Sequence, residues 1–186
     1  MRITASTIEW AEELVETPEK NAPELADLPD CFQWRDTLRQ VTTTLHDTSV
    51  LGMPPPHGVL FFGPPGNGKH TLARAYISTL WHGRNVGHEL VPLFRVDASQ
   101  FPEGLDLQKA LDRIDTVFDV ISDPGKYDFC DDAEFGIILF DQMERYAHVD
   151  ALAYSIAQWT ADLSDHAAVI CITEDESIIP SDLRRA

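Results

Sequence analysis

Basic residues are few in this chain of 186 residues. It holds 14 Lys and Arg against 31 Asp and Glu, which gives a formal net charge of −17. Because nucleic acids and anionic membranes repel a surface of that sign, the charge argues against either as a partner of the whole surface. Its simplest interpretation is solubility, and the hydrophobic share of 44% is that of an ordinary globular protein.

Cysteines are few as well, and long apolar runs are missing. Cys31, Cys130 and Cys171 are widely spaced and form no C-x-x-C pair, so the sequence predicts neither a zinc site nor a disulfide framework. Glutamates occupy N-terminal positions where a signal peptide would be apolar, and runs such as FGIILF are too short to cross a bilayer. These absences predict a protein of the reducing cytoplasm with no membrane partner.

The first 29 residues are predicted to form a helix and an acidic linker. Ser6 and Glu9 have the spacing of a helix-capping box, and a short amphipathic helix follows until Pro18. The stretch TPEKNAPELADLPD is rich in proline and acidic residues, which is typical of a linker. The remaining residues, 30–186, are enough for one domain with a real core.

Apolar strands and amphipathic helices alternate through residues 30–186. Strands are expected at 59–62, 90–96, 136–140 and 167–172, and helices at 30–45, 69–80, 105–121 and 149–163. Two helices carry stripes predicted to be buried, namely Trp34, Leu38, Val41 and Leu45, and Leu107, Leu111, Ile114, Phe118 and Ile121. This alternation predicts an α/β fold whose parallel sheet is covered by helices on both faces.

A glycine-rich loop connects the first of these strands to a helix. The stretch GPPGNGKHT, residues 63–71, matches the phosphate-binding pattern G-x-x-x-x-G-K-[ST] except after its lysine. Glycines let successive backbone N–H groups turn toward one point, and the following helix adds its positive N-terminal end. The alternative is a Gly-Pro turn with a structural role. The candidate nucleotide-binding residues are Pro64, Pro65, Gly66, Asn67, Gly68, Lys69, His70 and Thr71.

The residue after the lysine departs from that pattern. His70 stands where a hydroxyl would complete the coordination shell of Mg²⁺, and imidazole is bulkier and a poor ligand for a cation that prefers oxygen. Thr71 points about 100° further round the helix, so it does not simply replace the missing hydroxyl. The loop is therefore predicted to hold phosphate and to hold Mg²⁺ weakly.

Three segments carry a resemblance to a known family. They are PPPHGVLFFGPPGNGK, the apolar run IILFDQ with its acidic end, and TEDESIIPSDLRR. Together they resemble the AAA+ ATPases and, more narrowly, the AAA group of protein remodellers, over residues 30–186. The resemblance implies a three-layer P-loop NTPase sandwich, in which the strands, counted from the one before the loop, lie in the order 1-4-3-2. The family's fifth strand and C-terminal lid would follow LRRA, so it implies a large subdomain of a longer chain, or strand one as an exposed edge that a partner covers.

The resemblance also implies roles for individual residues. Lys69 would contact the nucleotide phosphates, and Asp141 would orient Mg²⁺ through water. Gln142 stands where the family has the glutamate that activates the attacking water, and an amide cannot accept that proton. Glu174 stands where a polar Asn senses the γ-phosphate. Arg185 matches an arginine finger that acts on the nucleotide of a neighbouring subunit.

The resulting prediction is an ATP-binding module of a remodelling or assembly ATPase with weak or impaired hydrolysis. The family implies a homo- or hetero-oligomeric ring, with a protein substrate as a further partner. Two alternatives stay open: an active ATPase in which Glu174 is the base and Gln142 positions the water, and a non-enzymatic assembly subunit that binds no nucleotide. Phe101, beside a proline, could be a remnant of the family's substrate-gripping loop or a local packing residue.

Overall fold

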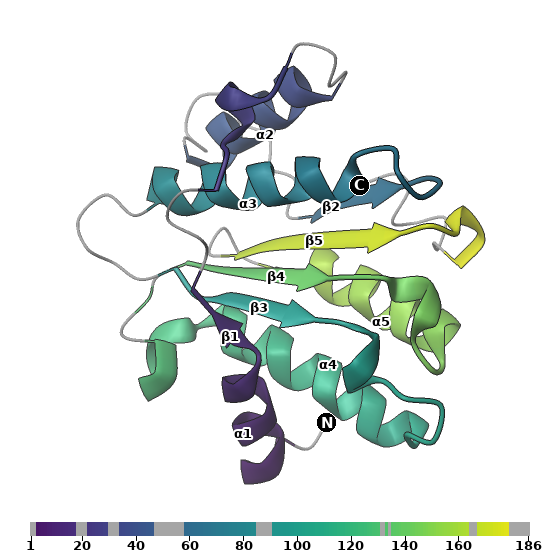
Figure 1. Cartoon of the computed structure of the whole chain (residues 1–186). Helices are drawn as coiled ribbons and strands as arrows, with labels where there is room; N and C mark the ends of the chain where they lie inside the picture. Colours follow the sequence, from purple (N-terminus) through teal and green to yellow (C-terminus); the bar gives the residue numbers. More distant parts are fainter. Residues whose placement is uncertain are drawn as a thin grey trace.

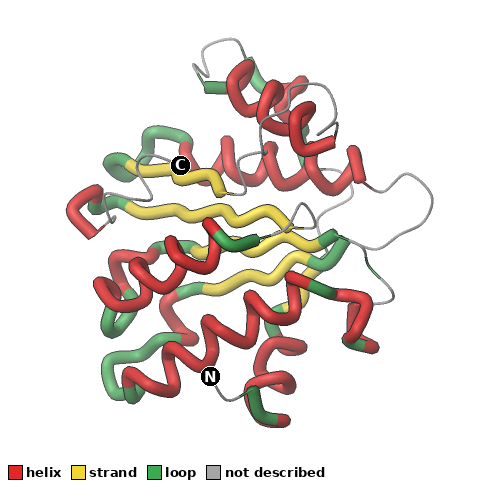
Figure 2. Tube along the Cα trace, turned by 180° about the vertical axis from the view of Figure 1, so that it is seen from behind, coloured by secondary structure: helices red, strands yellow, loops and turns green. Residues whose placement is uncertain are grey.

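A single sheet runs through the molecule with helices on both of its faces (Figures 1 and 2). The structure is a computed structural model, and it describes residues 3–17, 22–29, 34–46, 58–84, 91–130, 133, 135–163 and 167–178. Within these ranges, none of the helices combines the length and the apolar character needed to span a membrane.

The sheet has five strands in the order β1-β3-β4-β5-β2. The strands are β1 (Val15–Glu16), β2 (Gly58–Phe62), β3 (Leu93–Val96), β4 (Gly136–Phe140) and β5 (Ala167–Thr173). The pairs β2–β5, β5–β4 and β4–β3 are parallel. The predicted parallel α/β sandwich and the order of its four strands are therefore confirmed.

One strand was not predicted. The chain leaves its first helix at Leu14 and runs antiparallel to β3, where Val15 pairs with Phe94. The backbone N–H of Arg95 donates to the carbonyl of Leu14, which extends this contact by one hydrogen bond of 3.1 Å. The sequence predicted a helix that continues through Val15 to Pro18, because a strand of two residues is too short to show a periodicity. β1 thus adds a fifth, antiparallel member beside β3.

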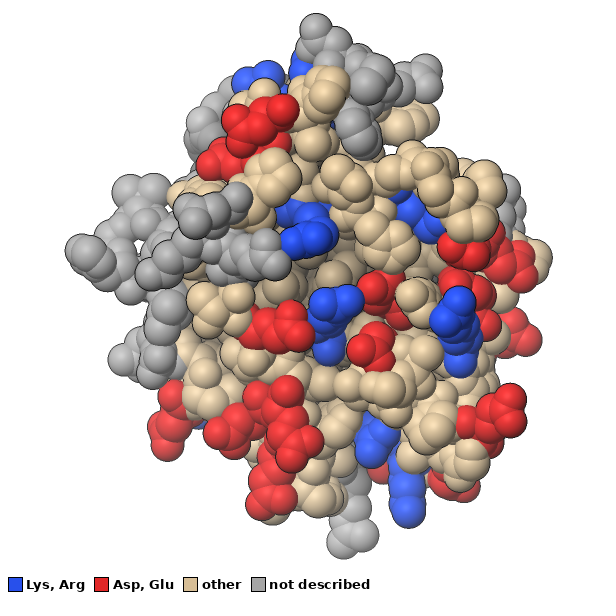
Figure 3. All heavy atoms as spheres, viewed as in Figure 1, with Lys and Arg blue, Asp and Glu red and all other residues tan. Residues whose placement is uncertain are grey.

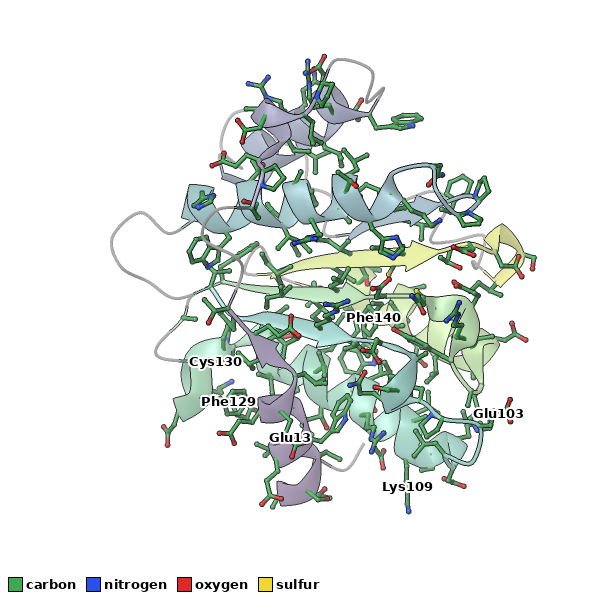
Figure 4. The ribbon with its side chains drawn as sticks, viewed as in Figure 1. Glu13, Glu103, Lys109, Phe129, Cys130 and Phe140 are labelled. Carbon is green, nitrogen blue, oxygen red and sulfur yellow. The ribbon has the colours of Figure 1, made fainter. Side chains whose placement is uncertain are left out.

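Five α-helices flank the sheet in the described part of the chain: α1 (Ala5–Glu13), α2 (Arg35–His46), α3 (Lys69–Arg84), α4 (Leu107–Ser122) and α5 (Val149–Ala161). One apolar cluster joins α1, α4 and α5 to one face of the sheet, and a second joins α2 and α3 to the other. β4 serves both clusters, because Ile138 and Phe140 point to the first and Ile137 and Leu139 to the second. Phe140 lies in the layer between the sheet and α4 (Figure 4).

Two residues of the predicted stripes are not buried. Trp34 is 63% exposed and Leu107 is 39% exposed. Each stands at the beginning of its helix, ahead of the turn that packs on the sheet, where burial begins at Leu38 and at Ala110. Helical periodicity marks the side of a helix that faces the core but not how far along the helix the contact extends. The side chain of Leu45 lies outside the described residues.

The predicted linker includes residues that pack on α3. Leu25 belongs to a short 3₁₀ turn, Leu25–Asp27, and its side chain is fully buried. Its backbone N–H donates to Thr79 Oγ1 at 2.9 Å, and Ser78 Oγ donates to the carbonyl of Ala22 at 3.1 Å. The sequence predicted a linker because isolated leucines among prolines and acids show no periodicity.

Phe101 is a packing residue and not a remnant of a substrate-gripping loop, the two roles that the sequence left open. Its side chain is fully buried, and its ring stacks on Tyr146 at a centroid distance of 5.0 Å. Trp10 of α1 meets the same ring edge-on at 6.3 Å. A side chain enclosed by two aromatic neighbours is part of the core and does not project to grip a substrate.

The N-cap of helix α1 lies two residues before the predicted one. Thr4 is the N-cap: its hydroxyl accepts from the backbone N–H of Thr7 at 3.3 Å, and Thr7 Oγ1 accepts from the backbone N–H of Thr4. The predicted cap, Ser6, lies within the helix. The second residue of this capping box is a threonine, whereas the usual motif has Glu or Gln at that position. The sequence therefore did not indicate it.

Replacing Thr4 by alanine should lower the free energy of unfolding by about 1 kcal/mol, because one backbone donor of α1 loses its partner. Ser6→Ala is the matched control, since it removes a hydroxyl within the same turn that does not cap the helix. Urea denaturation of both variants tests the assignment. If both variants lost the same stability, or Ser6→Ala lost more, the N-cap would be Ser6 and not Thr4.

Candidate nucleotide-binding site

The glycine-rich loop lies between the end of β2 and the beginning of α3, as its sequence context predicted. Gly63, Gly66 and Gly68 have φ angles of 134°, 79° and 84°, which residues with a side chain rarely adopt. A Cβ at Gly63 would also lie 2.5 Å from the Asn67 side chain. The loop turns over the N-terminal end of α3, and Pro64 to Asn67 are exposed there. This backbone conformation depends on the three glycines.

Lys69 is the buried cation of the loop, with 5% of its surface exposed. Its Nζ donates to the carbonyls of Gly63 at 2.8 Å and of Pro64 at 3.0 Å. The carboxylate Oε1 of Glu174, at the end of β5, lies 3.6 Å from the same Nζ. An ammonium has three donors, so two of them hold the loop and the carboxylate lies beside the group. Glu174 balances a charge that would otherwise be buried alone.

His70 and Asp141 form a direct pair. Nε2 of His70, on the first turn of α3, lies 2.9 Å from Oδ1 of Asp141, directly after β4. Asp141 is buried, whereas about half of the His70 side chain is exposed. The second carboxylate oxygen of Asp141 lies 3.4 Å from Nη2 of Arg95 on β3. Both oxygens of Asp141 therefore have a partner from the chain itself.

Arg95 is a member of this site that the sequence analysis missed. It is the exposed member of an otherwise buried strand. The other three residues of β3, namely Leu93, Phe94 and Val96, are buried. A cation within an apolar strand was the available signal. Its role needed the pairing of β3 with β4, which brings it to the end of the strand that carries Asp141.

Gln142 and Glu144 follow Asp141 in a short turn. Gln142 has a left-handed backbone, with φ 55° and ψ 47°, which is uncommon for a residue with a side chain and is found at functional sites. Oε2 of Glu144 accepts from Thr173 Oγ1 at 2.9 Å and from the backbone N–H of Glu174 at 3.0 Å. This contact ties the turn after β4 to the end of β5, and no sequence pattern indicated it.

The remaining predicted residues are placed as follows. Thr71 is exposed on the first turn of α3 and stays a candidate by position alone. Arg185 lies outside the described residues. The structure thus brings together Lys69, His70, Asp141 and Glu174, which come from different parts of the sequence.

A cavity of about 370 Å³ opens beside His70 and Asp141 on the face of the sheet that carries α3. Its lining joins apolar side chains of the sheet to charged groups of both signs, among them Glu16, Arg74 and Arg95. Figure 3 shows Lys and Arg side chains next to Asp and Glu side chains around this part of the front surface. Two arginines, Arg74 and Arg95, and two carboxylates, those of Glu16 and Asp141, line the cavity.

The groups of the site fit a phosphate better than a magnesium ion. A glycine loop, a lysine and the N-terminal end of a 16-residue helix are donors and positive charge, which an anion requires. Mg²⁺ requires oxygen ligands, yet both oxygens of Asp141 face nitrogen donors and residue 70 offers an imidazole.

A buried lysine at the end of a glycine loop, between a strand of a parallel sheet and a helix, defines the class of P-loop nucleotide-binding domains. A family model described as "ATPase family associated with various cellular activities (AAA)" matches residues 59–186 of the chain. Since this match spans more than half of the sequence, the chain belongs to the AAA family.

Curated relatives match a part of the chain. It is 39% identical over 82 residues to the proteasome-activating nucleotidase of Methanoculleus marisnigri, which covers 42% of this chain and 20% of that protein. It is 37% identical over 92 residues to the ATP-dependent zinc metalloprotease FtsH 3 of Sphaerobacter thermophilus, which covers 48% of this chain and 16% of that protein. The matched region is therefore a small part of these relatives.

Solved structures share the fold. The FIGL-1 AAA domain in complex with ADP superposes with a TM-score of 0.67 at 17% identity, covering 100% of this chain and 60% of that one. A structure on katanin self-assembly gives 0.62 at 18% identity, covering 100% of this chain and 58% of that one. At such identities the likeness concerns the fold alone.

Proposed function

We propose that this chain is the nucleotide-binding module of an AAA-type remodelling or assembly ATPase, and that it binds ATP with weak or impaired hydrolysis. The observation that carries the proposal is the buried Lys69 beneath a loop of three positive-φ glycines at the beginning of α3. Donors held in place before a ligand arrives bind a phosphate without the cost of ordering them. Residues 30–186 form this module in the proposal, with residues 1–29 as an N-terminal extension.

The impaired hydrolysis follows from the groups around Asp141. Phosphoryl transfer depends on charge stabilisation by a metal, a lysine and an arginine, and on a group that positions the attacking water. The chain keeps Lys69, but the carboxylate of Asp141 is engaged by His70 and Arg95. Gln142 can orient a water but cannot accept its proton. Arg185 is the proposed finger toward a neighbouring subunit.

Two alternatives each have an observation in their favour. Glu174 lies beside Lys69 with 40% of its side chain exposed, which suits a base for the attacking water if Gln142 positions that water. The second alternative is an assembly subunit that binds no nucleotide. It is favoured by Lys69 Nζ, which already contacts two carbonyls and a carboxylate of the chain.

The proposed partners are other subunits of a homo- or hetero-oligomeric ring and a protein substrate, as in the family at large. A reducing, cytoplasmic setting is part of the proposal. Cys130 and Cys171 are buried in the core, and burial raises the pKa of the Cys171 thiol to about 12. A buried thiol of that kind is a packing residue with little reactivity.

Titration with a fluorescent ATP analogue, in Mg²⁺ and in EDTA, tests the proposal. We expect the unmutated chain to bind with the same affinity in both buffers, because the donors of the site fit phosphate and not the metal. His70→Thr restores the hydroxyl and should make binding stronger in Mg²⁺ than in EDTA. Phosphate release should stay at least about 100-fold below that of an AAA ATPase with a glutamate base.

Two results would count against the proposal. A chain that is folded by circular dichroism but binds no analogue would support the assembly subunit. Mg²⁺-dependent turnover that Glu174→Gln abolishes would support the rearranged active site instead. In that case Glu174 would be the group that removes the proton.

A further inference from the structure

The carboxylate of Glu174 occupies the place beside the loop lysine where the outer phosphates of a nucleotide would bind. Its Oε1 lies 3.6 Å from Lys69 Nζ, and a lysine in such a loop reaches the β- and γ-phosphates. We propose that Glu174 makes the site selective for a nucleoside diphosphate over the triphosphate. This inference rests on the proposed function, because it requires a nucleotide whose phosphates contact Lys69.

Lys69 has little capacity left for a terminal phosphate. Two of the three donors of its Nζ hold the carbonyls of Gly63 and Pro64, and Glu174 lies on the remaining side. A β-phosphate seated in the loop is held by backbone N–H groups and the end of α3, and these donors do not involve Glu174. A γ-phosphate would lie further out, between Lys69 and a carboxylate of its own sign. Two negative charges beside the same lysine repel each other, and this repulsion weakens the binding of the γ-phosphate.

Glu174 is held at this position by its backbone. Its N–H donates to Oε2 of Glu144, and the same oxygen accepts the hydroxyl of Thr173. Thr173 is buried, and its Oγ1 also accepts from the N–H of Asp175. These contacts fix the end of β5 against the turn that follows β4. A triphosphate can therefore displace the Glu174 side chain but cannot easily move its Cα away from Lys69.

The surroundings provide little compensation for the added charge of a triphosphate. The Arg95 guanidinium is paired with Asp141, and His70 contacts the other oxygen of that carboxylate. Mg²⁺, which would neutralise a γ-phosphate, does not fit the donors around Asp141. Glu144 places a second carboxylate at the same end of the sheet. The local charge balance therefore favours the ligand with one phosphate fewer.

Calorimetric titration of the full chain with ADP and with ATP, both in EDTA, tests the proposal. We expect ADP to bind about tenfold more tightly than ATP, a difference of about 1.4 kcal/mol. Glu174→Gln keeps the shape of the side chain and removes its charge, so it should bring the two affinities within about threefold, mainly by strengthening ATP. Asp175→Asn is the matched control, because the carboxylate of Asp175 accepts from the N–H of Ser177 and is not the one beside Lys69. It should retain the preference for ADP.

A second pair of variants separates charge from position. Glu144→Gln keeps an oxygen acceptor for Thr173 and Glu174 and should retain most of the preference, whereas Glu144→Ala frees the end of β5 and should reduce it. Equal affinities for ADP and ATP in the unmutated chain, or an unchanged ratio in Glu174→Gln, would overturn the selectivity and leave nucleotide binding intact. A folded chain that binds neither nucleotide would overturn both proposals.

Discussion

Replacing Lys69 by alanine should weaken nucleotide binding at least about 100-fold, because the buried positive charge beside the phosphates and the hydrogen bonds that hold the loop at Gly63 and Pro64 are both lost. The ammonium is buried at the centre of the loop, and its donors converge on Gly63 and Pro64 before a ligand arrives. Displacement titration with unlabelled ADP measures the loss directly. ADP is the better ligand for this experiment, since its phosphates compete less with Glu174.

Controls separate the loss of the charge from a loss of folding. Lys69→Met retains the apolar stem of the side chain and should bind as poorly as Lys69→Ala while its urea midpoint stays closer to that of the unmutated chain. Lys109→Ala removes the same charge from α4, where the side chain is exposed and points away from the sheet (Figure 4). It should bind normally. If Lys69→Met bound ADP within about threefold of the unmutated chain, the loop would not be a working phosphate site.

Replacing Phe118 by alanine should lower the free energy of unfolding by about 3–5 kcal/mol, the largest effect on stability that we expect. Phe118 has no exposed surface. Its ring stacks between Phe140 of β4 and Trp159 of α5, each at a centroid distance of 6.1 Å. Removal of the ring leaves a cavity between three elements, and neighbours held by their own backbones cannot fill it completely.

Leu107→Ala is the matched control, because Leu107 lies on the same predicted stripe of α4 but is exposed at its beginning. Its loss should stay below about 1 kcal/mol. Urea denaturation monitored by circular dichroism gives both values. A loss for Phe118→Ala as small as that for Leu107→Ala would mean that α4 does not pack on the sheet as described.

The parallel sheet could be predicted because each of its strands is a predominantly apolar run, interrupted only by Arg95 in β3. Gly136–Phe140 was predicted with the bounds that the structure has, and β2, β3 and β5 were each predicted to within three residues at either end. The loop could be predicted because its backbone needs positive φ angles at three positions, and the sequence has glycine at each of them. The strands and the loop could be predicted because each is determined by residues that are neighbours in the sequence.

Contacts between distant residues were harder to predict. Glu144 lies 30 positions before Glu174 in the sequence, and nothing in either neighbourhood indicates the hydrogen bond between them. Arg95 and Asp141 meet because β3 and β4 are neighbours in the sheet, which the family resemblance implied but no periodicity did. The closeness of Glu174 to Lys69 likewise depends on the pairing of β2 with β5. Side-chain partners at the ends of strands follow from register, which a single sequence does not fix.

The place of β2 has a consequence for how the chain is made. In the described part of the chain, β2 pairs with β5 alone, and Gly58 lies opposite Val169. The segment that carries the loop therefore leaves the ribosome early but meets its hydrogen-bonding neighbour only after β3 and β4 have been synthesised. Contacts between such distant segments form late, because the intervening chain must close first. The loop therefore gains its final shape only after β5 has been synthesised, so a bound nucleotide would report that β5 has joined the sheet.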